Sequence, residues 1–366
     1  MIFTVVAVGD GACSVVRGWP DSQVMLVDCG TAGNAGVSAS GTLAMELRWH
    51  TALIDTVVIT HFDADHWRGL RDLPQHWVYP PGREVELRYP ALLPGDAGLT
   101  QRAYVALQAS RLSGPIFGAL DLVGAWQREG VAVRRRPSIR GDRFWGGGSL
   151  WSVHWPPTDD HRFDDRTQRR LRRLGTEIRT LAQQVDEFGV ALDAVQAAWF
   201  GGDDNSVDVD QLNRVTAAEL SDALKGALGD EGFEGFAKRL GAFTNELSLV
   251  HSNELVANFG DCEKSGLKAL FKMEADDQTL RASYPIILAP HHGTTKVSKA
   301  VRDRFPRASH GLVSQNGEKR YLDGQRDNQK AFKDAVTSGG GQELNTYNPS
   351  LAPSPHGPHV RFWLPS

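Results

Sequence analysis

The stretch that decides the fold is ITHFDADHWRGL, from Ile59 to Leu70, in which two histidines and two aspartates directly follow an apolar run. Residues two apart in an extended or loop backbone point the same way, so His61 and Asp63 can converge on one point. Asp65 and His66 then turn toward a neighbouring point. This spacing predicts a site for two metal ions. Taken alone, the same letters also fit a solvated polar loop with a helix N-cap at Asp65.

Three other segments place acids or imidazoles directly after apolar runs. These residues are Asp28 in VDCG, Asp261 in NFGDC, and His291 and His292 in PHHGT. Candidate ligands would then lie at the carboxyl ends of at least four strands, and loops on a rigid sheet commonly build metal sites. The ordered set therefore favours a metal centre over a polar loop.

The rest of the chain alternates strand and helix patterns. Apolar, β-branched runs over 3–8, 23–28, 53–60, 247–250, 255–258 and 284–289 predict strands, and residues 141–157 resemble a hairpin. Helical periodicity dominates 158–244, a range that contains no proline. We therefore expect a layered α/β domain formed by 1–157 and 245–366, with 158–244 as a helical insertion.

Composition excludes several classes of protein. Lys and Arg number 40 against 44 for Asp and Glu, so the net charge of −4 predicts no particular partner. The three cysteines include no Cys-x-x-Cys pair, which argues against a disulfide framework or a thiolate zinc site. No apolar run is long enough to cross a membrane, and MIFTVVAVGDG lacks the pattern of a signal peptide. We expect a soluble, cytoplasmic protein without membrane contact.

The ordered motifs VDCG, THFDADHWRG, GD and HHGT resemble the metallo-β-lactamase-fold hydrolases. The general pattern of that family has His where Asp63 stands, and the Asp variant is similar to the branch that contains the hydrolase domain of the competence protein ComEC. VVAVGDGACSVV, VHWPP, NELSLV and LVSQNGEKRY are also similar to that branch. The resemblance implies a metallo-β-lactamase-like αββα sandwich, with 1–157 and 245–366 as its two halves around the helical insertion.

The resemblance also implies a ligand set. His61 and Asp63 would serve one metal, Asp65 and His66 the other, with Asp261 bridging both. Either His291 or His292 would complete the second centre, and we favour His291, with His292 nearer the substrate. The expected metal ligands are therefore His61, Asp63, Asp65, His66, Asp261 and His291. Zn²⁺ is the default metal at both sites, while the carboxylate of Asp63 makes Mn²⁺ or Fe suitable as well.

Further residues receive supporting roles. Asp28 would act by hydrogen bonding to a ligand. Asp65, His292 and Lys296 are candidate catalytic residues, and Arg320 and Tyr321 are candidates for substrate contacts. The sequence departs from the family where many members carry a middle His, because neither Asn245 nor His251 in NELSLVH is a safe substitute.

The expected activity is hydrolysis by metal-activated water, since a two-metal centre requires no protein nucleophile. The ComEC resemblance points to phosphodiesters in nucleic acid or nucleotides. Basic runs over 134–143 and 166–174 could neutralise backbone phosphates, or they could be solvated faces. Trp145, Trp151 and Trp155 could stack bases, or they could pack within a hairpin.

Two other functions stay open. One is hydrolysis of a small ester, lactone or thioester, which is favoured if the helical insertion roofs the site into a small pocket. The other is a non-catalytic metal-binding module whose insertion binds a protein partner.

Overall fold

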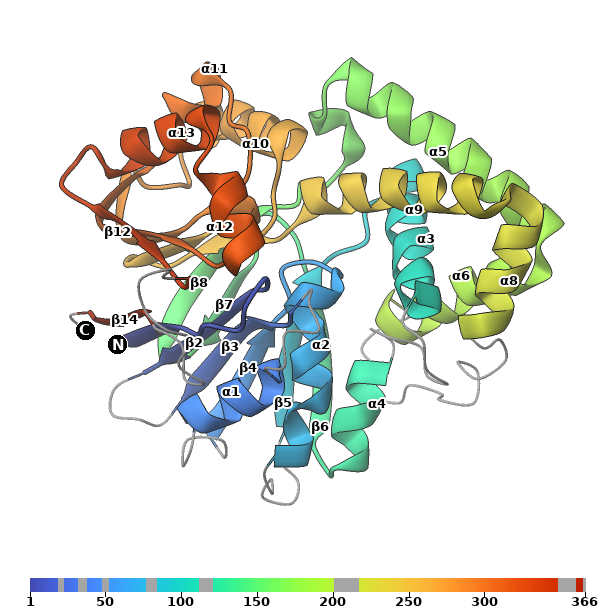
Figure 1. Ribbon diagram of the computed structural model, residues 1–366, viewed down its shortest axis with the longest axis horizontal. Coiled ribbons are helices and arrows are strands. Elements are labelled where there is room, and N and C mark those ends of the chain that lie inside the picture. Colours follow the sequence, from blue (N-terminus) through green and yellow to red (C-terminus); the bar gives the residue numbers. More distant parts are fainter. Residues whose placement is uncertain are drawn as a thin grey trace.

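The computed structural model describes residues 1–18, 23–31, 38–47, 53–76, 84–111, 121–200, 217–347 and 360–364. Within these residues, two seven-stranded sheets lie in the centre and helices cover their outer faces (Figure 1). The strand orders are β14-β1-β2-β3-β4-β5-β6 and β13-β12-β11-β10-β9-β8-β7. The predicted αββα sandwich is confirmed.

The first sheet contains a parallel block that carries two of the predicted motifs. Its strands are β1 (Ile2–Val5), β2 (Cys13–Arg17), β3 (Val24–Cys29), β4 (Ile54–Val58), β5 (Glu84–Pro90), β6 (Ala132–Ser138) and β14 (Val360–Trp363). Strands β3 to β6 pair in parallel, while β1 pairs antiparallel with both β2 and β14. The carboxyl ends of β3 and β4 therefore meet at one edge of the sandwich.

The second sheet brings the later motifs to the same region. Its strands are β7 (Arg143–Gly146), β8 (Ser149–Trp155), β9 (Val250–Ser252), β10 (Val256–Asn258), β11 (Ser283–Leu288), β12 (Arg307–Ser314) and β13 (Gln342–Asn345). Strands β10 to β13 pair in parallel, so Asp261 and the two neighbouring histidines follow strand ends that lie side by side.

Apolar side chains fill the space between the sheets. Phe3, Val27 and Val58 of the first sheet belong to the same buried cluster as Trp151 and Ile286 of the second. Helices α1 (Ala39–Leu47), α2 (Ala64–Asp72) and α4 (Asp121–Arg128) cover the first sheet, and α10 (Lys264–Asp277), α11 (Lys299–Arg302) and α13 (Asp327–Thr337) cover the second (Figure 1). Helix α12 (Glu318–Gly324) packs against residues 290–293, which follow β11 at the edge where these strands end.

Five helices form a group that we call the helical lobe. They are α3 (Gly95–Arg111), α5 (Asp165–Gln184), α6 (Asp186–Phe200), α8 (Ala217–Leu228) and α9 (Asp230–Thr244). Helix α3 packs against each of the other four, although it precedes the predicted insertion. The boundaries at 158 and 244 stay a prediction, and the polar segment at 201–216 lies outside the described residues.

Strand β5 and helix α3 are among the elements that the sequence analysis did not predict. Strand β5 alternates buried Val85, Leu87 and Tyr89 with charged residues, which is an ordinary strand pattern, and α3 follows it. The three cysteines are free and buried, so they act as small apolar side chains. Among the described residues, no helix combines the length and the apolar character that crossing a bilayer requires.

A close backbone contact holds the start of α2 against the end of β3. A Cβ at Gly30 would lie 2.3 Å from the carbonyl carbon of Asp65 and 2.5 Å from the carbonyl oxygen of Ala64. Ala12 bridges the same contact, because its N–H donates to Asp65 O at 3.0 Å and its carbonyl accepts from Gly30 N at 3.1 Å. Only glycine permits this approach.

We expect Gly30→Ala to lower the free energy of unfolding by about 2 kcal/mol, because the added methyl overlaps backbone atoms that cannot move aside. Gly226→Ala is the matched control: Gly226 lies in α8 with no atom within 4 Å of its Cβ position, so the substitution should raise stability by up to about 1 kcal/mol. Chemical denaturation measures both. Equal stability of Gly30→Ala and wild type would contradict the packing described here.

Candidate metal centre

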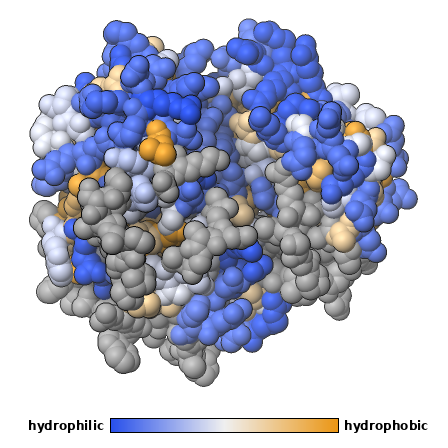
Figure 2. All heavy atoms as spheres, in the orientation of Figure 1, coloured by the Kyte–Doolittle hydropathy of each residue, from blue (hydrophilic) through white to orange (hydrophobic). Residues whose placement is uncertain are grey.

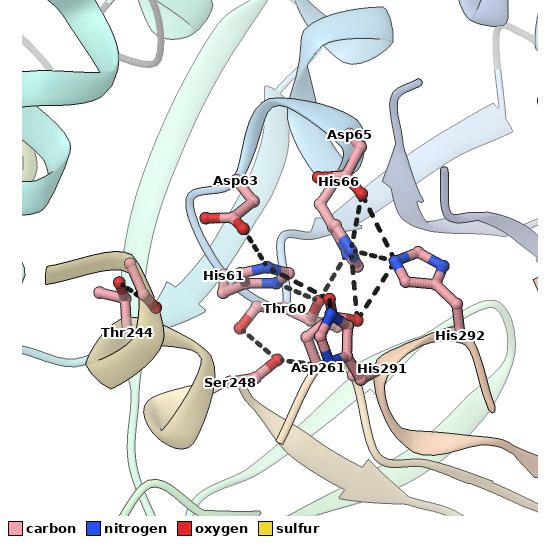
Figure 3. A network of polar contacts seen from close by, with 12 residues as sticks. Thr60, His61, Asp63, Asp65, His66, Thr244, Ser248, Asp261, His291 and His292 are labelled. Carbon is pink, nitrogen blue, oxygen red and sulfur yellow. Dashed lines mark hydrogen bonds and ion pairs between the residues drawn. The ribbon is translucent and has the colours of Figure 1, made fainter. Parts of the chain in front are cut away.

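Four strand ends bring acids and imidazoles together at one edge of the sandwich (Figure 3). Asp28 lies in β3, and the segment after β4 carries His61 and Asp63. Asp261 follows β10, and the two adjacent histidines follow β11 in a short helix, η5 (Pro290–Gly293). The convergence that was predicted from the ordered motifs is therefore present in the structure.

His61 and Asp63 form one side of the cluster. Nε2 of His61 lies 3.5 Å from Oδ2 of Asp63 and 3.8 Å from Oδ2 of Asp261. This nitrogen is buried and has no hydrogen-bond partner among the described residues. A buried ring nitrogen without a partner is costly in free energy, and a bound cation would satisfy it.

Asp65, His66 and His292 form the other side. Nε2 of His66 and Nε2 of His292 lie only 3.2 Å apart, and the latter is 3.4 Å from Oδ2 of Asp65. Oδ1 of Asp261 lies 3.4 Å from both ring nitrogens. Asp261 thus presents one oxygen to each side of the cluster, as its predicted bridging position requires.

The donor atoms fit a metal centre. Two groups, His61 with His66 and Asp261, and Asp65 with His66 and His292, each offer ligand atoms that lie within 4.8 Å of one another, and all of these residues are buried. Imidazole nitrogens and carboxylate oxygens together suit Zn²⁺, Mn²⁺ and Fe.

Charge within the cluster also favours a bound cation. Burial raises the pKa of Asp261, but the imidazoles of His292 and His66 outweigh burial and hold the pKa well below its usual range. Burial lowers the pKa of His66, but the carboxylates of Asp261, Asp28 and Asp65 outweigh it and hold this pKa well above its usual range. The buried acids therefore stay ionised and need positive charge nearby, from protonated imidazoles or from a metal.

The two adjacent histidines, His291 and His292, exchange the roles that we expected from the sequence. His292 is buried and faces Asp65 and His66, whereas His291 is 27% exposed and forms an ion pair with Glu263 through Nδ1. Nε2 of His291 still lies 3.6 Å from Oδ2 of Asp261. The geometry thus favours His292 over His291 for the second centre, the reverse of our preference from the sequence.

The reason for this exchange is a strained backbone. His291 and His292 both adopt left-handed conformations, with φ of 48° and 56°, and Asp28 does so with φ of 54°. Non-glycine residues rarely occupy this region, and such strain clusters at functional sites. A strand rule for side-chain direction does not apply to two consecutive left-handed residues.

Asp28 supports the cluster from behind. Its carboxylate accepts hydrogen bonds from Thr60 N at 2.7 Å, from Thr60 Oγ1 at 2.8 Å and from Nδ1 of His66 at 2.9 Å. Because Nδ1 donates a hydrogen bond to this carboxylate, the ring of His66 is oriented with Nε2 directed at the cluster. The position agrees with the hydrogen-bonding role expected for Asp28.

Thr60 and Ser248 were not singled out in the sequence. Ser248 Oγ donates to Thr60 O at 3.3 Å and accepts from Asp261 N at 2.8 Å (Figure 3). The two residues therefore connect the ligand segment after β4 with the ligand turn after β10. Small hydroxyl residues are common in loops, so the sequence carried no signal for this role.

The middle histidine of the broader family has no counterpart in the cluster. His251 is completely buried against Trp151 and Phe144, and burial lowers its pKa to about 4, so it is a neutral core residue. Asn245 begins a short helix, η4 (Asn245–Leu247), and its Oδ1 has no hydrogen-bond partner among the described residues. Neither residue belongs to the two ligand groups.

The helical lobe reaches the cluster through a residue that the sequence analysis missed. Tyr104 of α3 donates a hydrogen bond from its hydroxyl to Oδ1 of Asp63, and Gln108 Nε2 donates to the same hydroxyl at 2.5 Å. Burial and the charge of Asp63 raise the pKa of Tyr104, so the phenol remains a donor. Tyr104 thus leaves Oδ2 of Asp63 directed at His61.

Of the three remaining candidates, only Arg320 contacts the cluster. Its Nη2 donates to Oδ2 of Asp65 at 2.6 Å. Tyr321 packs against Tyr347, with ring centroids 5.5 Å apart, and Lys296 is exposed beside a separate cavity. Within the described part of the chain, no hydrogen bond or ion pair is seen between either of these two residues and the candidate ligands.

We expect Tyr104→Phe to weaken the binding of one metal ion by about 10-fold, because Asp63 loses the hydrogen bond that orients it. The measurement is competition with a chelator, with Zn²⁺ and Mn²⁺ in parallel. Tyr284→Phe is the matched control, since Tyr284 is equally buried but bonds to Ser252 at 3.0 Å, away from the cluster. Wild-type affinity in Tyr104→Phe would show that Asp63 needs no support from the lobe.

Comparison with known protein families agrees with the geometry. Residues 6–165 match the family model described as the metallo-beta-lactamase superfamily, and this segment includes Asp28 and the whole of ITHFDADHWRGL. No curated protein matches the sequence. Members of the superfamily are generally hydrolases and typically bind divalent metals. Residues 6–165 are thus similar to the metallo-beta-lactamase superfamily, and together with the two ligand groups this similarity indicates a metal-dependent hydrolase.

Proposed function

We propose that this protein is a metal-dependent phosphodiesterase of the ComEC-like type that acts on nucleic acid or nucleotides. The observation that carries the proposal is the guanidinium of Arg320. One of its terminal nitrogens is bonded to Asp65, while the other, Nη1, is buried and has no partner among the described residues. A buried cationic donor beside a metal cluster suits an anionic oxygen, which a phosphodiester supplies.

Each group in the cluster has a task in this reaction. His61 and Asp261, with Asp63 beside His61, would hold one cation. Asp65, His66 and His292, with the other oxygen of Asp261, would hold a second. When bound, such a pair supplies Lewis acidity and water that is ionised near neutral pH. Arg320 binds a non-bridging phosphoryl oxygen through Nη1 and keeps the carboxylate of Asp65 in place through Nη2.

Protonation in the cluster suits catalysis near neutral pH. Burial raises the pKa of Asp65, but His66, His292 and Arg320 outweigh burial and hold it well below its usual range. Asp65 is therefore ionised. Its carboxylate accepts hydrogen bonds but, as a weak base, does not take the proton of an attacking water. Nδ1 of His292 lies 2.7 Å from Gln315 O and donates to this carbonyl, which leaves its Nε2 directed at the cluster.

Hydrolysis of a small ester, lactone or thioester is the second candidate. It is favoured by the contact of Tyr104 with Asp63, which brings the helical lobe against one side of the centre. Phe62 reinforces this contact, because its ring meets that of Trp199 in α6 at a centroid distance of 5.0 Å. A partly covered site restricts large substrates more than small ones.

The test is a panel of bis-p-nitrophenyl phosphate, single-stranded and double-stranded DNA, RNA and lactones, each with Zn²⁺ and Mn²⁺. We expect hydrolysis of diesters, and its loss in Asp261→Asn, which removes a ligand atom from both sides of the cluster. Asp334→Asn is the control, because this exposed carboxylate pairs only with Lys330 at 3.2 Å on the surface of α13. Turnover of lactones alone would reject the phosphodiesterase, and a complete lack of turnover with bound metal would favour the non-catalytic module.

Arg320→Gln should lower kcat/KM for the anionic diester by about 100-fold, because a charged donor to the phosphoryl group is lost. The same variant should have a much smaller effect on an uncharged ester. Arg326→Gln is the matched control, since Arg326 is exposed and pairs with Asp323 at 2.7 Å. Metal content must be equal in all three proteins. Equal losses on charged and uncharged substrates would mean that Arg320 acts only through Asp65.

A further inference from the structure

A cavity of about 510 Å³ lies between the second sheet's outer helices. Five cationic side chains line it, namely Lys264, Lys268, Lys296, Lys299 and Arg302. Its lining, within the described residues, includes no Asp or Glu and no aromatic side chain. Figure 2 shows mainly hydrophilic side chains over the upper part of the molecule, where Figure 1 has α10, α11 and α13. We call this cavity the lysine groove.

Two lysines of the lysine groove follow candidate metal ligands closely in the sequence. Lys264 is the first residue of α10, which directly follows the turn of Asp261, and Lys296 follows the segment of His292. Glu263, the residue before Lys264, forms the ion pair with Nδ1 of His291. Two cations of the groove therefore follow candidate ligands within four residues in sequence, Lys264 after Asp261 and Lys296 after His292.

Most of the positive charge in the groove is uncompensated. Among the described residues, Lys264, Lys296 and Arg302 form no ion pair. The side chains of Lys264 and Lys296 are exposed. Lys268 pairs with Asp164 at 3.1 Å and Lys299 with Asp303 at 2.6 Å, but all four side chains are at least 40% exposed. Exposed pairs of this kind contribute little stability, so a stronger anion can replace the carboxylates.

The basic runs that were singled out in the sequence are organised differently. Arg134 pairs with Glu84 at 2.8 Å, and Arg140 pairs with Glu274 at 2.7 Å. Arg170 of α5 donates to the carbonyl of Arg239 at 2.9 Å. Arg169, Arg172 and Arg173 are exposed side chains of a single helix, α5. None of the described residues of these runs lines the lysine groove.

We propose that the lysine groove binds the sugar-phosphate backbone of a nucleic-acid strand whose scissile diester lies at the metal centre. This inference rests on the proposed phosphodiesterase. Convergent cations in a concave site neutralise successive phosphates, while Ser265, Ser298 and Asn328 add neutral donors. Because no aromatic side chain is present to stack on bases, binding should be independent of base sequence.

The test measures binding of a fluorescent phosphorothioate single strand, which keeps the backbone charge and resists hydrolysis, by anisotropy over a series of salt concentrations. In the combined variant Lys264→Gln, Lys296→Gln and Arg302→Gln, we expect affinity at low salt to fall at least 10-fold. The slope of log Kd against log salt should decrease by about 2, since each phosphate contact on a single strand contributes about 0.7.

The matched control is the combined variant Arg169→Gln, Arg172→Gln and Arg173→Gln, which removes the same number of charges from α5. Its affinity for the strand should stay within about 2-fold of the wild-type value. Equal melting temperatures verify folding. Unchanged binding in the groove variant, or an equal loss in the α5 variant, would overturn the proposal.

Two further probes identify the ligand class. A peptide nucleic acid of the same sequence has no backbone charge and should not bind, and polyglutamate of matched charge should compete weakly. Tight binding of either would assign the groove to another ligand. If the strand binds as expected but no diester is hydrolysed, the phosphodiesterase fails while the groove stands. If diesters are hydrolysed and the groove variant binds normally, only the groove fails.

Discussion

A chain of hydrogen bonds from Asp28 through Thr60 and Ser248 to Asp261 is the interaction on which the site depends. It crosses from the first sheet to the second, so it sets the distance between the two ligand-bearing edges. The same carboxylate of Asp28 orients the ring of His66. Gly260 makes the chain possible, because a Cβ there would lie 2.3 Å from Ser248 Oγ. The packing of the two sheets thereby determines the relative positions of the residues in the candidate metal centre.

Electrostatics distinguishes the candidate site at the edge of the sandwich from an ordinary polar surface. Buried carboxylates at Asp65 and Asp261 stay ionised because imidazoles and Arg320 face them. Such a concentration of charge away from water is stable only when its members are paired or bound to metal. Tyr104 extends the same network into the helical lobe by its bond to Asp63. The lobe is therefore joined to the centre by a specific polar contact as well as by apolar packing.

Much of the fold and the candidate site could be predicted from local sequence. A ligand residue directly after an apolar run lies at a strand end, and the carboxyl ends of parallel strands meet at one edge. This reasoning identified Asp28, His66 and Asp261, which the structure brings together. The strand and helix patterns predicted a layered α/β domain, and the resemblance to the metallo-β-lactamase fold implied the αββα sandwich. These features depend on neighbours within a few residues, so the sequence by itself determined them.

Tertiary structure decided the rest, because those features join residues that are distant in sequence or depend on backbone conformation. His292 faces the cluster in place of His291 because both residues adopt left-handed conformations. Tyr104 bonds to Asp63 only because α3 packs with the later helices of the lobe. The cations of the lysine groove come from α10, from α11 and from the segment between η5 and α11. In the two basic runs of the sequence, by contrast, the arginines pair with acids or are exposed on α5. Charge density along a sequence does not reveal charge density in space, since folding brings together residues that no local pattern connects.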